Sequence, residues 1–191
     1  PGEDVESFAA GFDRLVALHP HEIQVGMLKR LRGAPICRHT EAFGLRFSPH
    51  PPYEILATDR IPFADMRRLA RFARYWDLIA NSGRFPHTLP LLLGKAPFTR
   101  FLALGDWLWQ HTRQTHGFAL ERLFDLLHRG LPEALHLDAA QVEAALALDY
   151  RSSRAHGTPA FLRGCRMPAA DQDTRRARQL RHQQAQQVSK G

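Results

Sequence analysis

Cysteine is scarce in this chain, and long apolar runs are missing. Only Cys37 and Cys165 occur among the 191 residues, too few for a disulfide framework or for a four-cysteine metal site within the chain. No apolar run approaches the roughly 20 residues that a membrane-spanning helix needs, and no signal-like segment opens the sequence. We therefore expect a cytoplasmic protein with no membrane partner. The apolar fraction of 44% is still enough to fill a core.

Excess positive charge is confined to one end of the chain. Residues 1–150 carry 17 Lys and Arg against 17 Asp and Glu, whereas residues 151–191 carry 9 against 2. The arginines of this tail stand among glutamines with few apolar neighbours, which predicts a frayed helix or a flexible tail. Such a tail can bind phosphates. However, it has no aromatic residue after Phe161 for base stacking, so nucleic acid is not the favoured partner.

Residues 1–36 have the pattern of a piece of a larger α/β enzyme. Apolar residues recur from Val5 to Leu18 at the spacing of a packed helix, and Ile23, Val25 and Met27 then alternate with smaller or polar residues as in a strand. Loop, helix and strand in succession form part of a β/α repeat. A lone strand leaves both edges unpaired, so we expect its partners upstream, and self-association through the open edges.

The remainder of the sequence predicts helices. Pro35 suits the start of a short helix over residues 36–43, and three prolines within residues 49–52 mark a domain boundary. Helical spacing then recurs over residues 63–80, 98–112, 119–129 and 139–150. The predicted fold is therefore mainly α, with a short α/β remnant over residues 1–49, an all-helical domain over residues 50–150 and a basic tail over residues 151–191.

Three tryptophans could form either a core or a stacking platform. Trp76, Trp107 and Trp109 share helical spacing with leucines. Because aromatic rows at this spacing usually pack inside, we expect all three in the core, with Trp76 and Trp107 in one core beside Leu108.

Three arginines form a stripe on one predicted helix. Arg67, Arg71 and Arg74 follow i, i+4, i+7 spacing, which is typical of a solvated face. The alternative is a docking surface for the rest of an enzyme, or for an anionic ligand. His19 and His21 stand close together, but on a turn without a second pair of ligands, so a metal site is not favoured. No triad of nucleophile, base and orienting residue can be assembled.

Several segments resemble the C-terminal portion of bacterial radical S-adenosylmethionine proteins that carry a cobalamin-binding domain. In that group a catalytic barrel is followed by a helical domain of unknown function, and the similarity covers about residues 1–150. The segments that carry the resemblance are PGEDVESF at 1–8, EIQVGMLK at 22–29, RGAPI at 32–36, PPYEIL at 51–56 and YWDLIANSGRF at 75–85.

The resemblance implies that the α/β remnant is the end of a partial TIM-type barrel. The loop after the fifth barrel strand would be residues 1–3, and the sixth strand would be residues 23–28. In such barrels these elements lie near the adenosine part of S-adenosylmethionine. The resemblance therefore implies Gly2, Glu3, Val25 and Met27 as cofactor-binding residues, with no catalytic residue and no metal ligand in the chain.

The family's cofactors would be held elsewhere. The family's iron–sulfur cysteines are spaced C-x3-C-x2-C, and this motif does not occur here. The resemblance thus implies a parent enzyme with S-adenosylmethionine, a 4Fe-4S cluster and cobalamin. This chain would retain none of them and would be inactive without upstream cobalamin-binding and barrel domains as partners. The alternative is a free-standing basic helical module that binds nucleic acid or a protein.

Overall fold

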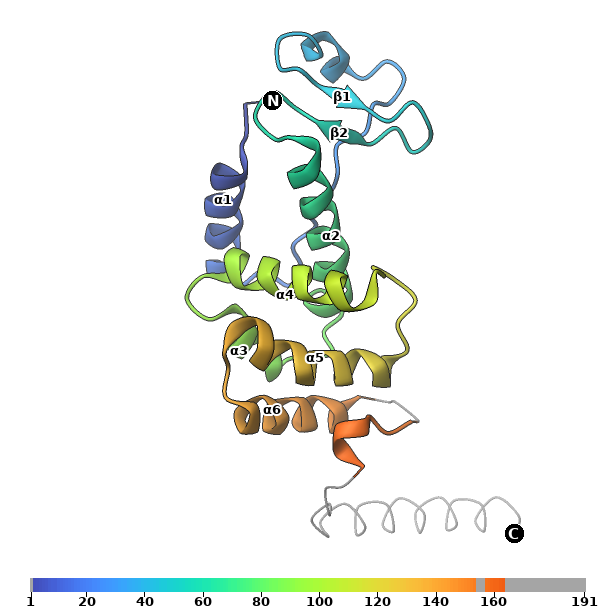
Figure 1. Cartoon of the computed structure of the whole chain (residues 1–191). Helices are drawn as coiled ribbons and strands as arrows, with labels where there is room; N and C mark the ends of the chain where they lie inside the picture. Colours follow the sequence, from blue (N-terminus) through green and yellow to red (C-terminus); the bar gives the residue numbers. More distant parts are fainter. Residues whose placement is uncertain (1, 154–156, 164–191) are drawn as a thin grey trace, which may run out of the picture. The chain divides into compact units, whose positions relative to one another are not determined.

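A computed structural model describes residues 2–153 and 157–163 (Figure 1). The chain divides into two compact units, Pro1–Ala160 and Phe161–Gly191. Nearly all of the described residues belong to the first unit, and the description below concerns that unit. The predictions on the arginine-rich part of the tail, from residue 164 onward, lie outside the described residues.

The predicted mainly α fold is confirmed. None of the helices among the described residues is both long enough and apolar enough to cross a bilayer. The six α-helices of the described residues are α1 (Val5–Ala17), α2 (Phe63–Ile79), α3 (Thr88–Leu93), α4 (Pro97–Thr112), α5 (Leu120–Leu135) and α6 (Ala139–Ser152). Two 3₁₀-helices, η1 (Pro35–His39) and η2 (Ala160–Leu162), and two short strands, β1 (Arg46–Phe47) and β2 (Ile55–Ala57), complete the list.

The proline-rich stretch is the turn of a small hairpin. Strands β1 and β2 pair antiparallel, with Arg46 opposite Ala57 and Phe47 opposite Ile55, and the turn between them holds a cis Pro51–Pro52 bond. Sequence reasoning missed this hairpin. The predicted helix over residues 36–43 is only partly present: the 3₁₀-helix η1 covers Pro35–His39, and turns follow over residues 40–44.

Helix α1 begins at a capping box. The Asp4 carboxylate accepts a hydrogen bond from Ser7 N–H at 2.8 Å, and the Ser7 hydroxyl accepts one from Asp4 N–H at 3.0 Å. These bonds satisfy backbone groups that a helix start leaves unpaired. The helix then buries Phe12.

An aromatic cluster joins α1, α2 and α4. The Phe12 ring lies 5.0 Å from Phe72 and 4.7 Å from Trp76, both edge to face, and Phe72 lies 5.1 Å from Phe98. Helix α4 crosses near the lower end of α1 (Figure 1), where the Asp13 carboxylate of α1 accepts a hydrogen bond from Phe98 N–H at 2.7 Å. One core therefore contains residues from both sides of the boundary predicted at residue 49.

Helix α5 extends past its predicted end. The sequence Gly130-Leu131-Pro132 predicted a stop, but α5 continues to Leu135. Its buried face runs through Leu123, Leu127 and Leu131, all with at most 1% exposure. A proline removes one backbone donor, and burial of this continuous apolar face outweighs that loss.

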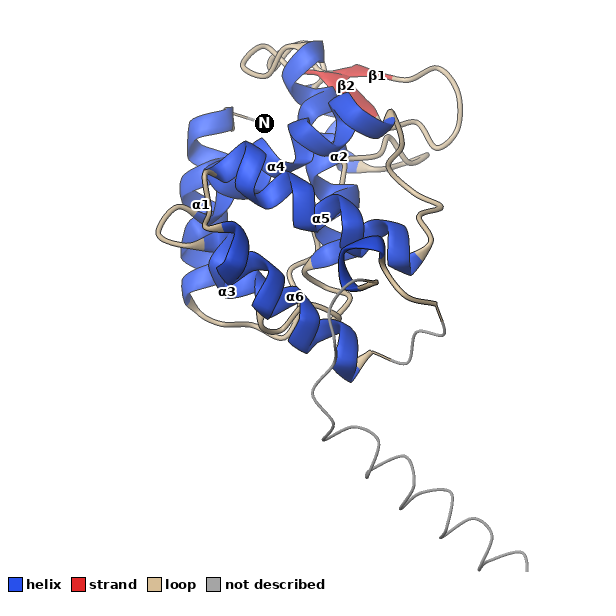
Figure 2. Cartoon of the chain, turned by 60° about the horizontal axis from the view of Figure 1, so that its bottom comes forward, coloured by secondary structure: helices blue, strands red, loops and turns tan. Residues whose placement is uncertain are grey.

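A buried carboxylate ties α6 to α3. Asp149 of α6 is fully buried and accepts hydrogen bonds from His87 N–H at 2.8 Å and Thr88 N–H at 2.9 Å. Helices α3 and α6 pack together (Figure 2). Sequence reasoning missed α3, because its six residues include a proline and its N-terminal groups are capped by a residue 61 positions away.

The prediction for the tryptophans is right for two of three. Trp76 and Trp107 are 4% and 7% exposed, and Leu108 is fully buried. Trp107 Nε1–H donates to Glu133 Oε2 at 2.9 Å. The prediction that Trp109 lies in the core is wrong, because Trp109 is only half-buried. The guanidinium groups of Arg71 and Arg113 lie over its ring.

Candidate functional site

Residues 22–28, predicted as a strand, are not part of any strand. The segment is held at two points. The Asn81 side chain bonds to both Ile23 N–H, at 3.3 Å, and the Ile23 carbonyl, at 3.0 Å, while the Leu28 carbonyl accepts from Ile55 N–H at 2.8 Å. A single antiparallel bridge joins Lys29 to Glu54. The segment therefore has few ladder partners, as expected for a lone strand with both edges unpaired.

The predicted alternation of side chains along this segment is present nevertheless. Ile23, Val25 and Met27 are half-buried, and the residues between them are exposed. Between the two anchors, residues 24–27 make no backbone hydrogen bond to any other residue in the described part of the chain. The segment thus has a strand's side-chain order and two open backbone edges.

The four predicted cofactor-binding residues lie around one pocket. Gly2, Glu3, Val25 and Met27 all line a pocket of about 150 Å³, which we call the α1–α2 pocket. Apolar side chains from other elements form the remaining wall: Phe8, Leu28, Leu45, Ile55, Ile61, Met66 and Leu69. Sequence reasoning missed these residues because they come from helices and strands far apart in the chain.

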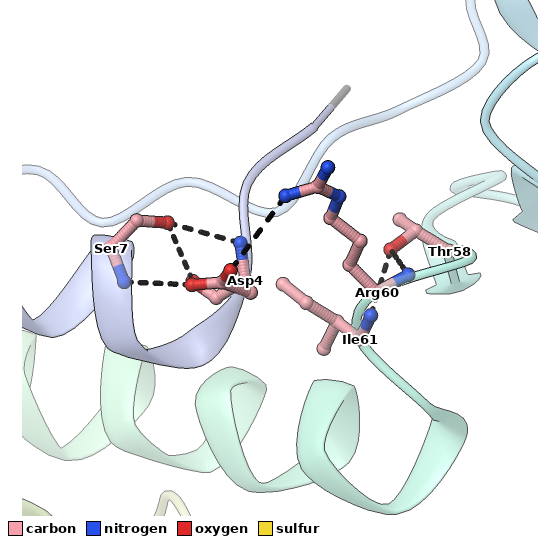
Figure 3. A network of polar contacts seen from close by, with 5 residues as sticks. All are labelled: Asp4, Ser7, Thr58, Arg60 and Ile61. Atoms are coloured by element: carbon pink, nitrogen blue, oxygen red, sulfur yellow. Dashed lines mark hydrogen bonds and ion pairs between the residues drawn. The ribbon is translucent and has the colours of Figure 1, made fainter.

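A polar network lies beside this pocket (Figure 3). Arg60 Nη1 points at Asp4 Oδ2, 3.9 Å away, and links the start of α1 to the loop before α2. The Thr58 hydroxyl accepts hydrogen bonds from Arg60 N–H at 3.1 Å and Ile61 N–H at 2.9 Å, which shapes that loop. Hydrogen bonds from Ser7 lower the pKa of Asp4, and Arg60 adds to the effect. The network therefore holds two walls of the pocket together.

A larger hollow adjoins residues 23–26 and shares Glu3, Phe8, Val25 and Gly26 with the α1–α2 pocket. It has a volume of about 540 Å³ and is lined by the apolar face of α1, including Phe8, Phe12 and Leu15. Two of its leucines are unusually accessible, Leu15 at 48% and Leu18 at 76% exposure. Val25 and Gly26 thus border two hollows with apolar walls, and their amides have no backbone partner among the described residues.

The lining of the α1–α2 pocket suits an apolar group more than a reacting centre. The walls of the α1–α2 pocket are mainly aliphatic and aromatic, and Glu3 supplies its one charged side chain. Small-molecule sites generally have volumes of about 300–1,000 Å³. At about 150 Å³ the pocket is smaller than such a site. Across residues 2–153 and 157–163, no three His, Cys, Asp or Glu side chains gather in a way that could hold a metal ion.

A family model matches residues 41–190 of the chain, and its description is "Protein of unknown function (DUF4080)". The chain belongs to this family. The DUF4080 match includes the hairpin and helices α2 to α6 and excludes α1 and residues 20–28. The α1–α2 pocket therefore has one wall inside the DUF4080 match and one wall before it. No curated protein and no solved structure matches the chain.

Proposed function

We propose that this DUF4080 chain is the C-terminal part of a cobalamin-dependent radical S-adenosylmethionine enzyme. Residues 1–49 would complete its catalytic barrel, and the later helices would brace that barrel. The supporting observation is the segment 24–27, whose backbone has no backbone partner among the described residues and whose Val25 and Gly26 border two hollows. In a closed barrel every strand pairs on both edges, so this segment is where neighbouring strands would add.

The α1–α2 pocket would face the adenosine portion of S-adenosylmethionine. Its apolar walls suit a heterocycle, and the Glu3 carboxylate would accept hydrogen bonds from hydroxyl or amine groups. Gly2 has a φ of +77°, which lets the backbone run close to a ligand. The pocket's small size fits this proposal, because elements of the preceding barrel would supply the missing wall.

The iron–sulfur cluster and cobalamin would be held by the upstream domains. When bound, the cluster supplies the electron that cleaves S-adenosylmethionine. The two cysteines of this chain do not form the C-x3-C-x2-C motif, so we expect the isolated chain to hold no cluster and to have no activity. Its own contribution would be to position the adenosine and to exclude water from it.

The proposal is tested on the complete gene product. We expect its upstream sequence to contain C-x3-C-x2-C, and the protein, reconstituted without oxygen, to bind about four irons and to release 5′-deoxyadenosine from S-adenosylmethionine. The isolated chain should do neither. An upstream sequence without the motif would overturn the proposal and favour the free-standing binding module.

A variant in the same protein tests the role of the pocket. Val25→Phe would fill the α1–α2 pocket and should weaken binding of S-adenosylmethionine by about tenfold or more, with no change in iron content. Ile23→Phe is the matched control, because Ile23 is half-buried on the same segment but lines only the hollow over α1. If both variants bind S-adenosylmethionine equally well, the α1–α2 pocket does not contact the cofactor.

A further inference from the structure

Helix α2 presents a row of arginines to a second pocket. Arg67, Arg71 and Arg74 line a hollow of about 260 Å³, together with Trp109 of α4 and Thr115 just after it. The β2 side of the hollow contributes Glu54, Ile55 and Leu56. We call this hollow the arginine pocket. Three guanidinium groups and one carboxylate among its lining residues give it a net positive charge.

The positive charge of Arg71 is only partly balanced by a neighbouring carboxylate. Its guanidinium lies over the Trp109 ring, 5.1 Å from the centroid, and its Nη2 is 4.0 Å from Asp106 Oδ1. Asp106 also pairs with Arg68, whose Nε–H donates to it at 2.7 Å. One carboxylate therefore serves two guanidinium groups. The buried Nε of Arg71 has no hydrogen-bond partner among the described residues, which is costly unless another anion offsets the charge.

The two outer arginines have no ion-pair partner among the described residues. Within the part of the chain that the structure describes, neither Arg67 nor Arg74 lies within 4.0 Å of a carboxylate, although both are exposed and line the arginine pocket. Arg67 lies over the Phe63 ring at 5.9 Å from its centroid. Stacking on aromatic rings orients a guanidinium fork while leaving its N–H groups available to a ligand.

We propose that the arginine pocket binds the phosphate group of a small molecule. Planar guanidinium forks bind phosphate through paired, charge-assisted hydrogen bonds, and three of them at i, i+4 and i+7 reach the same side of the helix. Thr115 lines the same pocket, and a threonine hydroxyl is a neutral hydrogen-bond donor. A pocket of about 260 Å³ holds a small phosphate-bearing molecule and not a stretch of duplex.

This assignment is independent of the proposed radical chemistry. The arginine pocket lies within the DUF4080 match except for Met27. It needs no upstream domain, so the isolated chain is the protein to test. Its failure would leave the proposal for the α1–α2 pocket unaffected.

The test is a calorimetric titration of the purified chain with inorganic pyrophosphate at fixed ionic strength. We expect binding with a Kd of about 1 mM or tighter. Arg71→Met keeps an apolar stem against Trp109, and Arg74→Gln removes a second charge. Each should raise the Kd about tenfold. The matched control is Arg84→Gln, which removes one exposed charge from the loop after α2, outside the pocket, and should change the Kd less than about twofold. Circular dichroism checks that each variant is folded.

Three results would overturn the proposal. One is no detectable heat from pyrophosphate up to about 10 mM. Another is an equal loss of pyrophosphate affinity in Arg84→Gln and Arg74→Gln, which would mean that diffuse positive charge attracts the anion. The third is that the chain binds short duplex DNA more tightly than pyrophosphate and that the pocket variants lower its affinity for the duplex as much as its affinity for pyrophosphate. That result would make this face a nucleic-acid surface. If Arg71→Met is unfolded, Arg74→Gln alone decides.

Discussion

At the scale of single residues, the buried carboxylate of Asp149 joins two helices. It accepts two backbone hydrogen bonds at the start of α3, from a position with no solvent exposure. A buried charge is tolerated only where such bonds replace its hydration. The stability of α3 therefore depends on a residue of α6.

Asp149→Asn should destabilise the chain by about 2–3 kcal/mol, because it weakens two charge-assisted bonds and places an amide group against a backbone donor. Urea denaturation measures the change. Asp138→Asn is the matched control, since Asp138 caps α6 at an exposed position where asparagine caps equally well. Equal losses of unfolding free energy from both substitutions would show that the buried position of Asp149 adds no stability beyond that of an exposed helix cap.

Tyr75 should make stability depend on alkaline pH. Burial raises the pKa of Tyr75 above its usual value of 10.0, and a hydrogen bond from Thr112 and the nearby Arg71 oppose this. The folded state therefore holds the phenol proton more tightly than the unfolded state. The resulting stabilisation is complete below about pH 10 and is lost as pH rises through the folded pKa.

Tyr75→Phe removes this titration together with the hydrogen bond from the phenol to the Gln114 carbonyl at 2.7 Å. We expect the free energy of unfolding to fall by about 1 kcal/mol at pH 7. Above pH 10 the difference in unfolding free energy between the variant and the wild type should be smaller. Unfolding curves measured from pH 7 to 11 test both. A difference that grows with pH would contradict the assigned direction of the pKa shift.

Trp107 and Gly130 should be coupled. A Cβ built on Gly130 would lie 2.7 Å from a ring carbon of Trp107, so α4 and α5 approach closely only because this residue is glycine. Trp107→Ala should cost about 3–5 kcal/mol, and Gly130→Ala about 1–3 kcal/mol. In the double variant the cost of Gly130→Ala should be much smaller, because the two closest contacts are gone and only Leu104 Cδ1 stays near, at 3.2 Å. Additive losses in a double-mutant cycle would contradict this packing.

At the scale of elements, apolar periodicity predicted most of the structure. Helices α2, α4 and α6 lie within two residues of their predicted ends, because their buried stripes are long. The misses have local causes. The hairpin has strands too short to show alternation, α3 depends on the distant Asp149, and α5 runs through Pro132 because the buried leucines continue. The predicted strand over residues 22–28 has the right alternation but no neighbour.

Helix α1 should be essential to the helical core. Phe12 is 3% exposed and contacts rings of α2 and α4. Phe12→Ala should therefore cost about 3–5 kcal/mol and shift a single unfolding transition. Leu18→Ala, at 76% exposure, should change stability by less than about 0.5 kcal/mol. Two separate transitions, with only the smaller one affected, would show that residues 1–49 fold apart from the helices.

At the scale of the whole molecule, the sequence pointed to some residues of each of the two pockets but not to the complete lining of either. Gly2, Glu3, Val25 and Met27 were predicted by resemblance, and the structure brings them around one pocket. Their opposite wall comes from the hairpin and α2, which no local pattern could pair with them. Likewise, the arginine stripe was visible in the sequence, but Trp109 and Thr115 join it only through the packing of α4 on α2. Self-association through the open segment stays a prediction.

Hydrogen exchange at the amides of residues 24–27 bears on the proposed barrel, because those amides lack backbone partners in this chain. In the isolated chain we expect them to exchange within seconds, while the buried amides of Leu104 and Leu108 in α4 stay protected. In the complete gene product, pairing with upstream strands should slow the amides of residues 24–27 by about 100-fold or more. The same fast exchange in both proteins, with α4 protected in each, would contradict the proposal that this segment is a barrel strand.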